Sequence, residues 1–218
     1  MINKVIAFGC SFFRHSHDNE EPWRSSKGIH TTTSIPEQHK YLHYSRPISE
    51  TSVIEELAEL LKVPSYNGSI GGSGNRAIIY RLINYIKNND TTDNLFIIGL
   101  SELTRFDFIK PSILKKWPKL SKEEYARFYD EEDVKFEIST LIELASLYLK
   151  SKNINHLFIN AMNDYMSTKD ICNTFIFPNG AEYWRSYIRS YDSTYRKGHP
   201  NVDDHKRLAN LLYEQLDI

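Results

Sequence analysis

The stretch Leu95-Phe96-Ile97-Ile98-Gly99 decides the fold class, because it is a short apolar run with no polar side chain on either face. A strand of this kind is buried on both sides, as is typical of parallel sheets covered by helices. Similar short runs occur at Val5-Ile6-Ala7-Phe8 and at His156-Leu157-Phe158-Ile159-Asn160, and Ser65-Tyr66-Asn67 is a shorter candidate. The sequence therefore predicts several parallel strands.

Segments with helical periodicity alternate with these strands along the chain. Apolar residues recur with helical spacing in four segments, at residues 49–62, 75–87, 133–150 and 201–215. This alternation predicts an α/β fold, a three-layer α/β/α sandwich with a short, mostly parallel sheet of about five strands. We expect residues 1–218 to form one domain, with long loop insertions at about 14–47 and 106–130 that are candidates for lids or substrate loops.

The composition excludes several classes of protein. The 27 Lys and Arg residues balance 28 Asp and Glu residues, so the chain lacks the charge of a dedicated nucleic-acid-binding module. No segment has the roughly 18–20 consecutive apolar residues of a membrane span, and the N-terminal segment lacks the features of a secretion signal. The two cysteines, Cys10 and Cys172, suit a reducing compartment. These features predict a cytoplasmic protein with no nucleic-acid and no membrane partner.

Polar residues follow the expected strands at the edge where ligands bind in parallel α/β folds. Ser11 lies just past the first strand, where its hydroxyl could sit at the N-terminus of the next turn or helix. Backbone N–H groups at such a place stabilise a developing negative charge, so Ser11 is a candidate nucleophile. A simple capping role is the alternative.

A glycine-rich turn, Asn67-Gly-Ser-Ile-Gly-Gly-Ser-Gly-Asn75, follows the short strand candidate. Glycines let the backbone approach a ligand closely, so Gly71 or Gly72 could donate an N–H to an oxyanion and Asn75 could add a side-chain amide. The turn matches neither a phosphate-binding loop nor a dinucleotide site. A flexible connection between strand and helix is the alternative.

A histidine precedes a proline near the C-terminus, in Gly198-His199-Pro200. The residue before a proline is held extended, which keeps the His199 imidazole away from the helix that follows. His199 is therefore a candidate general base toward a serine on another loop, and His205 is the fallback. A surface histidine beside a helix start is the alternative for either one.

Four short blocks together resemble the SGNH (GDSL-type) hydrolase superfamily, and most closely its divergent bacteriophage-like members. The blocks are Gly9-Cys10-Ser11-Phe12, Ile70-Gly71-Gly72-Ser73-Gly74-Asn75, Gly99-Leu100-Ser101-Glu102 and Gly198-His199-Pro200-Asn201, and they occur in family order. The resemblance implies the flavodoxin-like SGNH fold and an acyl or O-acetyl esterase, acting on a carbohydrate or similar substrate without a cofactor. It implies Ser11 as nucleophile, His199 as base, and an oxyanion hole from Gly71, Gly72, Asn75 and Ser101.

Two positions depart from the family pattern. Arg196 occupies the place of the family aspartate, so Asp192 or Asp203 would have to orient the imidazole, or the site would work as a Ser–His dyad. Loss of the orienting acid can cost about 10⁴ in turnover. Ser101 replaces the family asparagine, and loss of one oxyanion donor costs roughly 10²–10³. Arg105 could substitute for that donor or hold an anionic group of the substrate.

These departures keep a second function open, that of a catalytically degenerate SGNH-like binding or structural protein of phage origin that recognises a glycan and could belong to a virion. A metal site is not expected, because five histidines within one loop need not converge. The expected partner is a small-molecule or glycan ester. The oligomeric state is not predicted.

Overall fold

The computed structural model describes six stretches of the chain, residues 2–13, 51–70, 73–102, 130–162, 173–192 and 200–216. Nearly all of the two expected insertions therefore falls outside the described residues. The same holds for the site candidates Gly71, Gly72, Arg105 and His199.

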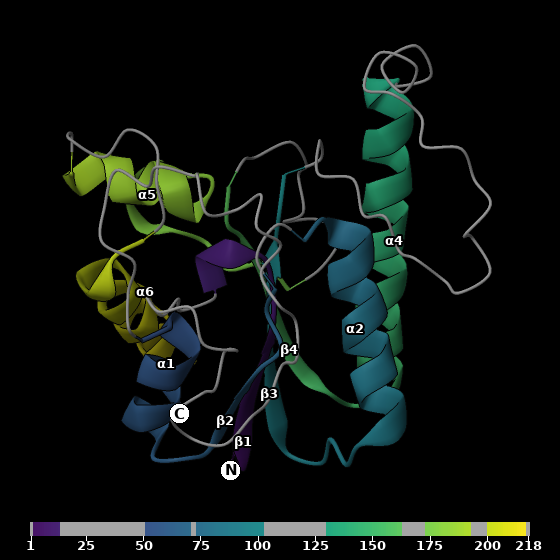
Figure 1. Ribbon diagram of the computed structural model, residues 1–218, viewed down its shortest axis with the longest axis horizontal. Coiled ribbons are helices and arrows are strands. Elements are labelled where there is room, and N and C mark those ends of the chain that lie inside the picture. The colour runs from purple at the N-terminus through teal and green to yellow at the C-terminus, as the bar shows by residue number, and fades with distance from the viewer. Residues whose placement is uncertain are drawn as a thin grey trace, which may run out of the picture.

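A four-stranded parallel sheet forms the centre of the protein (Figure 1). Its spatial order is β2-β1-β3-β4, with every neighbouring pair parallel. The strands span Lys4–Phe8 (β1), Ser65–Asn67 (β2), Asn94–Leu100 (β3) and Asn155–Asn160 (β4). Every residue of β3 is buried, as the unbroken apolar run predicts. The parallel α/β class is confirmed.

The expected fifth strand is absent from the described residues, so the sheet has four strands rather than five. A single parallel bridge pairs Thr174 with Phe158 of β4. The Phe158 N–H donates to the Asn173 carbonyl at 2.7 Å, and the Phe175 N–H donates to the Phe158 carbonyl at 2.8 Å. The pairing goes no further, and the chain soon turns into the 3₁₀-helix η4 (Pro178–Gly180).

Helices cover both faces of the sheet and complete the three layers (Figure 1). On one side lie α1 (Val53–Leu61) and α6 (Val202–Gln215), which pack on each other, and on the other lie α2 (Asn75–Asn88) and α4 (Glu131–Ser151). A further helix, α5 (Trp184–Tyr191), lies beyond the carboxyl ends of the strands. None of the helices in the described stretches is long and apolar enough to cross a membrane.

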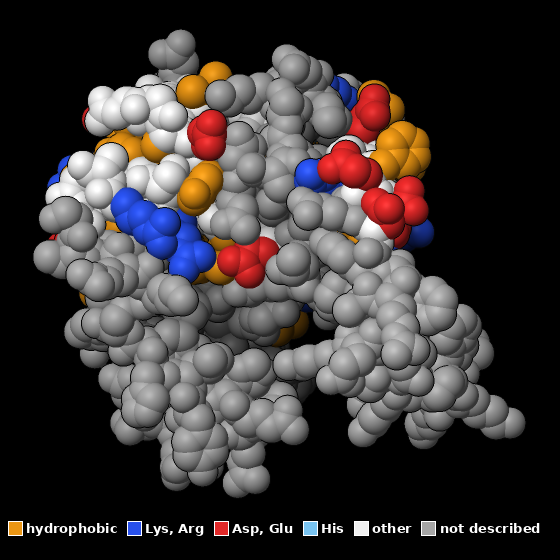
Figure 2. Space-filling model, turned by 90° about the horizontal axis from the view of Figure 1, so that it is seen from above, with side chains coloured by type: hydrophobic (Ala, Val, Ile, Leu, Met, Phe, Trp, Pro, Cys, Tyr) orange, Lys and Arg blue, Asp and Glu red, His pale blue; other side chains and the backbone are white. Residues whose placement is uncertain are grey.

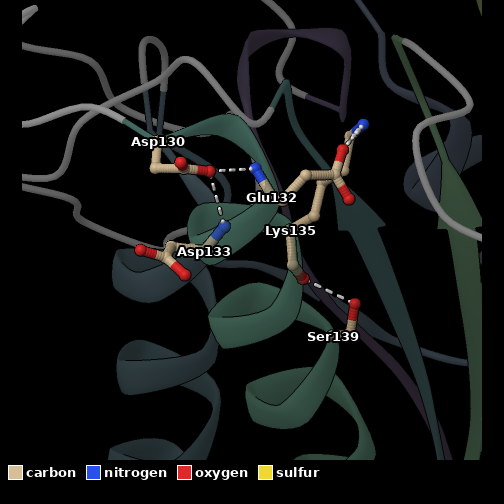
Figure 3. Close-up of polar contacts among 5 residues, drawn as sticks. All are labelled: Asp130, Glu132, Asp133, Lys135 and Ser139. Carbon is tan, nitrogen blue, oxygen red and sulfur yellow. Dashed lines mark hydrogen bonds and ion pairs between the residues drawn. The ribbon is translucent and has the colours of Figure 1, made fainter.

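The N-terminus of α4 is capped by Asp130 (Figure 3). The Asp130 carboxylate accepts hydrogen bonds from the backbone N–H groups of Glu132 at 2.8 Å and Asp133 at 3.2 Å. These bonds satisfy two of the four N–H groups that a helix start leaves unpaired. Lys135 pairs with Glu132 at 2.8 Å, and the Ser139 hydroxyl donates to the Lys135 carbonyl. The cap fixes the residue at which α4 begins.

Candidate active site at the carboxyl ends of the strands

Ser11 is the first residue of the 3₁₀-helix η1 (Ser11–Phe13), which begins three residues after β1 ends. The Phe13 N–H donates to the Cys10 carbonyl at 3.1 Å and closes the turn. Phe12 and Phe13 are buried, and both pack edge-on against Trp184 of α5. The residues after Ser11 thus anchor the backbone of the Ser11 turn, residues 9–13, in the core.

Hydrogen bonds join the Ser11 turn to the start of the glycine-rich turn. The Gly9 carbonyl accepts from the Ile70 N–H at 3.1 Å and from Arg81 Nη2 at 3.3 Å. The Asn67 side-chain amide donates to the Phe13 carbonyl at 2.7 Å. Residues 68–70 therefore lie beside η1, although the oxyanion candidates that follow them, Gly71 and Gly72, fall outside the described part of the chain.

Asn75 and Ser101, the other two oxyanion candidates, are brought together. Asn75 Nδ2 donates to the Ser101 carbonyl at 3.0 Å, and the Ser101 N–H donates to Asn75 Oδ1 at 2.7 Å. Both side chains are buried, and the Ser101 hydroxyl lies 4.0 Å from the Met162 sulfur. Asn75 thereby ties the start of α2 to the end of β3, and its amide has a structural task besides any catalytic one.

His205, the fallback base, is buried between α6 and α1. Its Nδ1 accepts a hydrogen bond from the Val53 N–H at 3.0 Å, and its ring packs edge-on against Trp184. An accepting Nδ1 is unprotonated, so Nε2 carries the proton in the neutral ring. The imidazole supplies an acceptor to an otherwise unpaired N–H at the start of α1. His205 therefore docks two helices together.

The chain that follows His199 is held by a carboxylate that sequence reasoning missed, Asp204. It is buried, and it accepts from the Asn201 N–H at 2.8 Å and from the Tyr191 hydroxyl at 2.7 Å. Asn201 caps α6 in return by accepting from the Asp204 N–H. Burial, aided by the neighbouring Asp204 carboxylate, raises the pKa of Tyr191, which keeps this hydroxyl a donor. The Asn-x-x-Asp spacing was the available signal, since it matches a capping box.

The candidate orienting acids lie on either side of this segment. Asp203 is exposed in the first turn of α6, and Asp192 follows the last residue of α5. His199 itself, and Arg196 in the place of the family aspartate, fall outside the described residues. Among the residues that are described, no group of three or more His, Cys, Asp or Glu side chains could hold a metal ion.

A second feature missed from the sequence is an ion pair at the same edge. Glu102 follows Ser101 at the end of β3, and Arg185 lies in the first turn of α5. Arg185 Nη1 lies 3.6 Å from Glu102 Oε1. Figure 2 looks down on this face of the protein, where acidic and basic side chains lie near one another.

Comparisons with known proteins identify this arrangement of strands. No protein-family model and no curated protein matches the sequence. Solved structures do match: a lipolytic protein of the G-D-S-L family from Desulfitobacterium hafniense superposes with a TM-score of 0.52 at 9% identity, covering 97% of this chain and 98% of the other. The chain has an SGNH-type hydrolase fold.

Two esterases share this SGNH-type fold. An acetylxylan esterase from Geobacillus stearothermophilus matches with a TM-score of 0.52 at 11% identity, over 99% of this chain and 94% of the other. A psychrotrophic esterase from Pseudoalteromonas matches with a TM-score of 0.50 at 10% identity, over 99% of this chain and 97% of the other. The fold expected from the four sequence blocks is thus confirmed over nearly the whole chain.

Proposed function

We propose that this protein is a serine ester hydrolase of SGNH type that removes an acyl group, foremost an O-acetyl group, from a carbohydrate. Ser11 attacks the ester carbonyl, and His199 accepts its proton and returns it to the leaving alcohol. Backbone N–H groups of Ser11 and of Gly71 or Gly72 stabilise the oxyanion, with Asn75 or Ser101 as a further donor. Water then hydrolyses the acyl-enzyme, and no cofactor takes part.

The observation that carries this proposal is the joining of three sequence blocks at one edge of the sheet. The Ile70–Gly9 hydrogen bond links the glycine-rich turn to the turn that bears Ser11. The paired bonds between Asn75 and Ser101 link the same turn to the end of β3. A nucleophile and backbone donors must lie close together for acyl transfer, and this linkage supports such a site. The esterases that share the fold support an ester as the substrate.

The base needs an orienting partner if the site is a full triad. Asp192 and Asp203 remain the candidates, since Asp204 already serves Asn201 and Tyr191. A Ser–His dyad is the other arrangement. Arg105 is a candidate contact for an anionic part of the substrate.

A glycan-binding protein that has lost catalysis is the second candidate, and one observation favours it. The Ser101 hydroxyl lies against the Met162 sulfur, and the Asn75 amide bonds the Ser101 backbone. Both potential side-chain donors to an oxyanion thus have other neighbours. Such a site would recognise an acylated sugar without cleaving it.

Intact mass after exposure to a fluorophosphonate ester separates the two candidates, because this probe reacts with an activated serine whatever the natural substrate. We expect one adduct on the wild-type protein and none on Ser11→Ala or His199→Ala. Ser69→Ala is the matched control, since Ser69 is a buried serine near the same edge whose hydroxyl has no hydrogen-bond partner among the described residues. It should label like the wild type. A folded wild type that stays unlabelled would contradict the hydrolase and favour the binding protein.

A further inference from the structure

Glu102 and Arg185 lie at the carboxyl ends of the strands, the same side of the sheet as the candidate site. Glu102 directly follows Ser101 beyond β3, and Arg185 is the second residue of α5, which Figure 1 shows on the α1 and α6 side of the sheet near the carboxyl ends of the strands. Their side chains are only 25% and 18% exposed. These two charged groups near the candidate site are therefore mostly buried but still reachable from solvent.

The Arg185 backbone is held firmly, yet one of its side-chain donors, Nε, has no acceptor among the described residues. Its backbone N–H donates to the Ala161 carbonyl at 3.1 Å, and the preceding Trp184 is fully buried. Its contact with Glu102 at 3.6 Å is longer than a good N–H···O hydrogen bond. The two side chains therefore form an ion pair without a close hydrogen bond. Arg185 Nε is shielded from solvent and has no acceptor within the described stretches. A shielded donor without a partner is costly, so this guanidinium is prepared for an acceptor that arrives from outside.

The chemistry of the pair selects the kind of ligand. An arginine offers only donors and a carboxylate only acceptors. An anionic ligand would be repelled by Glu102, and a cationic one by Arg185. A neutral ligand with two neighbouring hydroxyl groups fits both, because one hydroxyl donates to the Glu102 carboxylate while the other accepts from the Arg185 guanidinium.

We infer that Glu102 and Arg185 form a subsite for two adjacent hydroxyl groups of a neutral sugar, on the alcohol side of the scissile ester. The pair is specificity-determining rather than catalytic, since it touches no reacting atom. The inference rests on the proposed function for the position of the ester, whereas the sugar contact itself can be measured without turnover.

The first test compares two acetate esters that differ in their hydroxyl groups, a monoacetylated methyl xyloside and cyclohexyl acetate. The kcat/KM of the wild type should be higher for the xyloside. Hydrogen bonds to charged groups contribute about 1.5–3 kcal/mol, so Glu102→Gln and Arg185→Gln should lower the xyloside-to-cyclohexyl ratio roughly 10- to 100-fold. Arg185→Lys, which keeps the charge but not the planar fork, should lie between. Arg189→Gln, an exposed arginine one turn further along α5, should keep the wild-type ratio.

The second test measures binding of the same xyloside acetate to Ser11→Ala protein by ligand-observed NMR, so that it also applies if the wild type does not hydrolyse esters. Adding Glu102→Gln or Arg185→Gln should weaken binding at least 10-fold, and adding Arg189→Gln should not. If these variants bind the xyloside acetate more weakly but the wild type is not labelled by the fluorophosphonate, the sugar subsite stands and the hydrolase proposal is rejected. If the fluorophosphonate labels the wild type and all variants have the same xyloside-to-cyclohexyl ratio, the hydrolase proposal stands and this subsite is rejected. The lysine variant keeps the test decisive if Arg185→Gln does not fold.

Discussion

At the scale of single residues, Gly99 shows why a glycine is needed near the end of the central strand. The Phe13 ring packs so closely over this position that a Cβ on Gly99 would lie 2.2 Å from two of its ring carbons. Phe13 belongs to the same 3₁₀-helix as Ser11. The glycine of the third sequence block therefore makes room for the turn that carries Ser11.

Gly99→Ala should consequently damage the site as well as the fold. The Phe13 ring must move away from the new methyl group, and overpacking of this kind costs roughly 1–3 kcal/mol. We expect a lower urea midpoint and at least a tenfold slower reaction of Ser11 with the fluorophosphonate. Gly180→Ala is the control for adding a methyl group to a glycine in open space, although its positive φ of 71° also strains alanine. A labelling rate unchanged in Gly99→Ala would show that the position of Phe13 does not influence Ser11.

His205 illustrates which features of single residues cannot be predicted from the sequence. The spacing of His205 from Pro200 did not reveal its buried place, because its partner Val53 lies 152 residues away in the chain. The link between Asn75 and Ser101 was equally hidden, although both residues were named as candidates. A motif names the residue types that a site needs, whereas the hydrogen-bond partner of each depends on packing between distant segments.

At the scale of elements, Asn67 connects three of them. From the end of β2, its Nδ2 donates to the Phe13 carbonyl in η1 at 2.7 Å and to the Ser52 hydroxyl before α1 at 3.0 Å. Its Oδ1 accepts from the Ser69 N–H at 3.1 Å. One buried amide therefore sets the position of the Ser11 turn relative to β2 and α1.

Replacing this amide should loosen all three elements together. Asn67→Ala leaves the Phe13 carbonyl and the Ser69 N–H without these partners in a buried place, which costs about 1–3 kcal/mol for each unsatisfied group. We expect the free energy of unfolding in urea to fall by about 2–4 kcal/mol. Asn88→Ala removes an exposed amide bonded to Asn84 on α2 and should change it by less than about 0.5 kcal/mol. Equal losses in the two variants would refute the linking role of Asn67.

Helices with an aliphatic face and the short strands were predicted well, whereas an aromatic helix and the number of strands were not. The predicted helix at 75–87 and strand at 65–67 agree with α2 and β2 to within a residue. Helix α5 was missed because its buried side is made of Trp184, Tyr187 and Ile188, with no aliphatic run to mark it. The expected fifth strand is absent from the described residues, where Thr174 makes a single bridge to β4. Whether a segment pairs with the outermost strand of a sheet depends on that neighbouring strand. The local sequence pattern carries no information about such a neighbour.

At the scale of the whole molecule, the two ends of the parallel strands differ in chemistry. The carboxyl edge carries the candidate site, whereas the opposite end carries a buried histidine, His156, near the start of β4. Its Nδ1 lies 2.9 Å from the Ile154 carbonyl, and its Nε2 lies 3.3 Å from the Ser146 hydroxyl of α4. A neutral ring satisfies both, with Nδ1 donating to the carbonyl and Nε2 accepting from the hydroxyl. His156 therefore joins α4 to the sheet in its uncharged form.

Stability should accordingly fall in mild acid. Burial lowers the pKa of His156 below its usual 6.5, outweighing the Ile154 carbonyl that raises it, and the Lys150 charge lowers it further. The unfolded chain thus binds a proton at a higher pH than the folded one, so the free energy of unfolding decreases as the pH falls below about 6.5. Urea unfolding at pH 7.5 and pH 5 should show a larger loss for the wild type than for His156→Gln, which cannot titrate. An NMR titration that found a His156 pKa at or above 6.5 in the folded protein would contradict this, whether or not the variant folds.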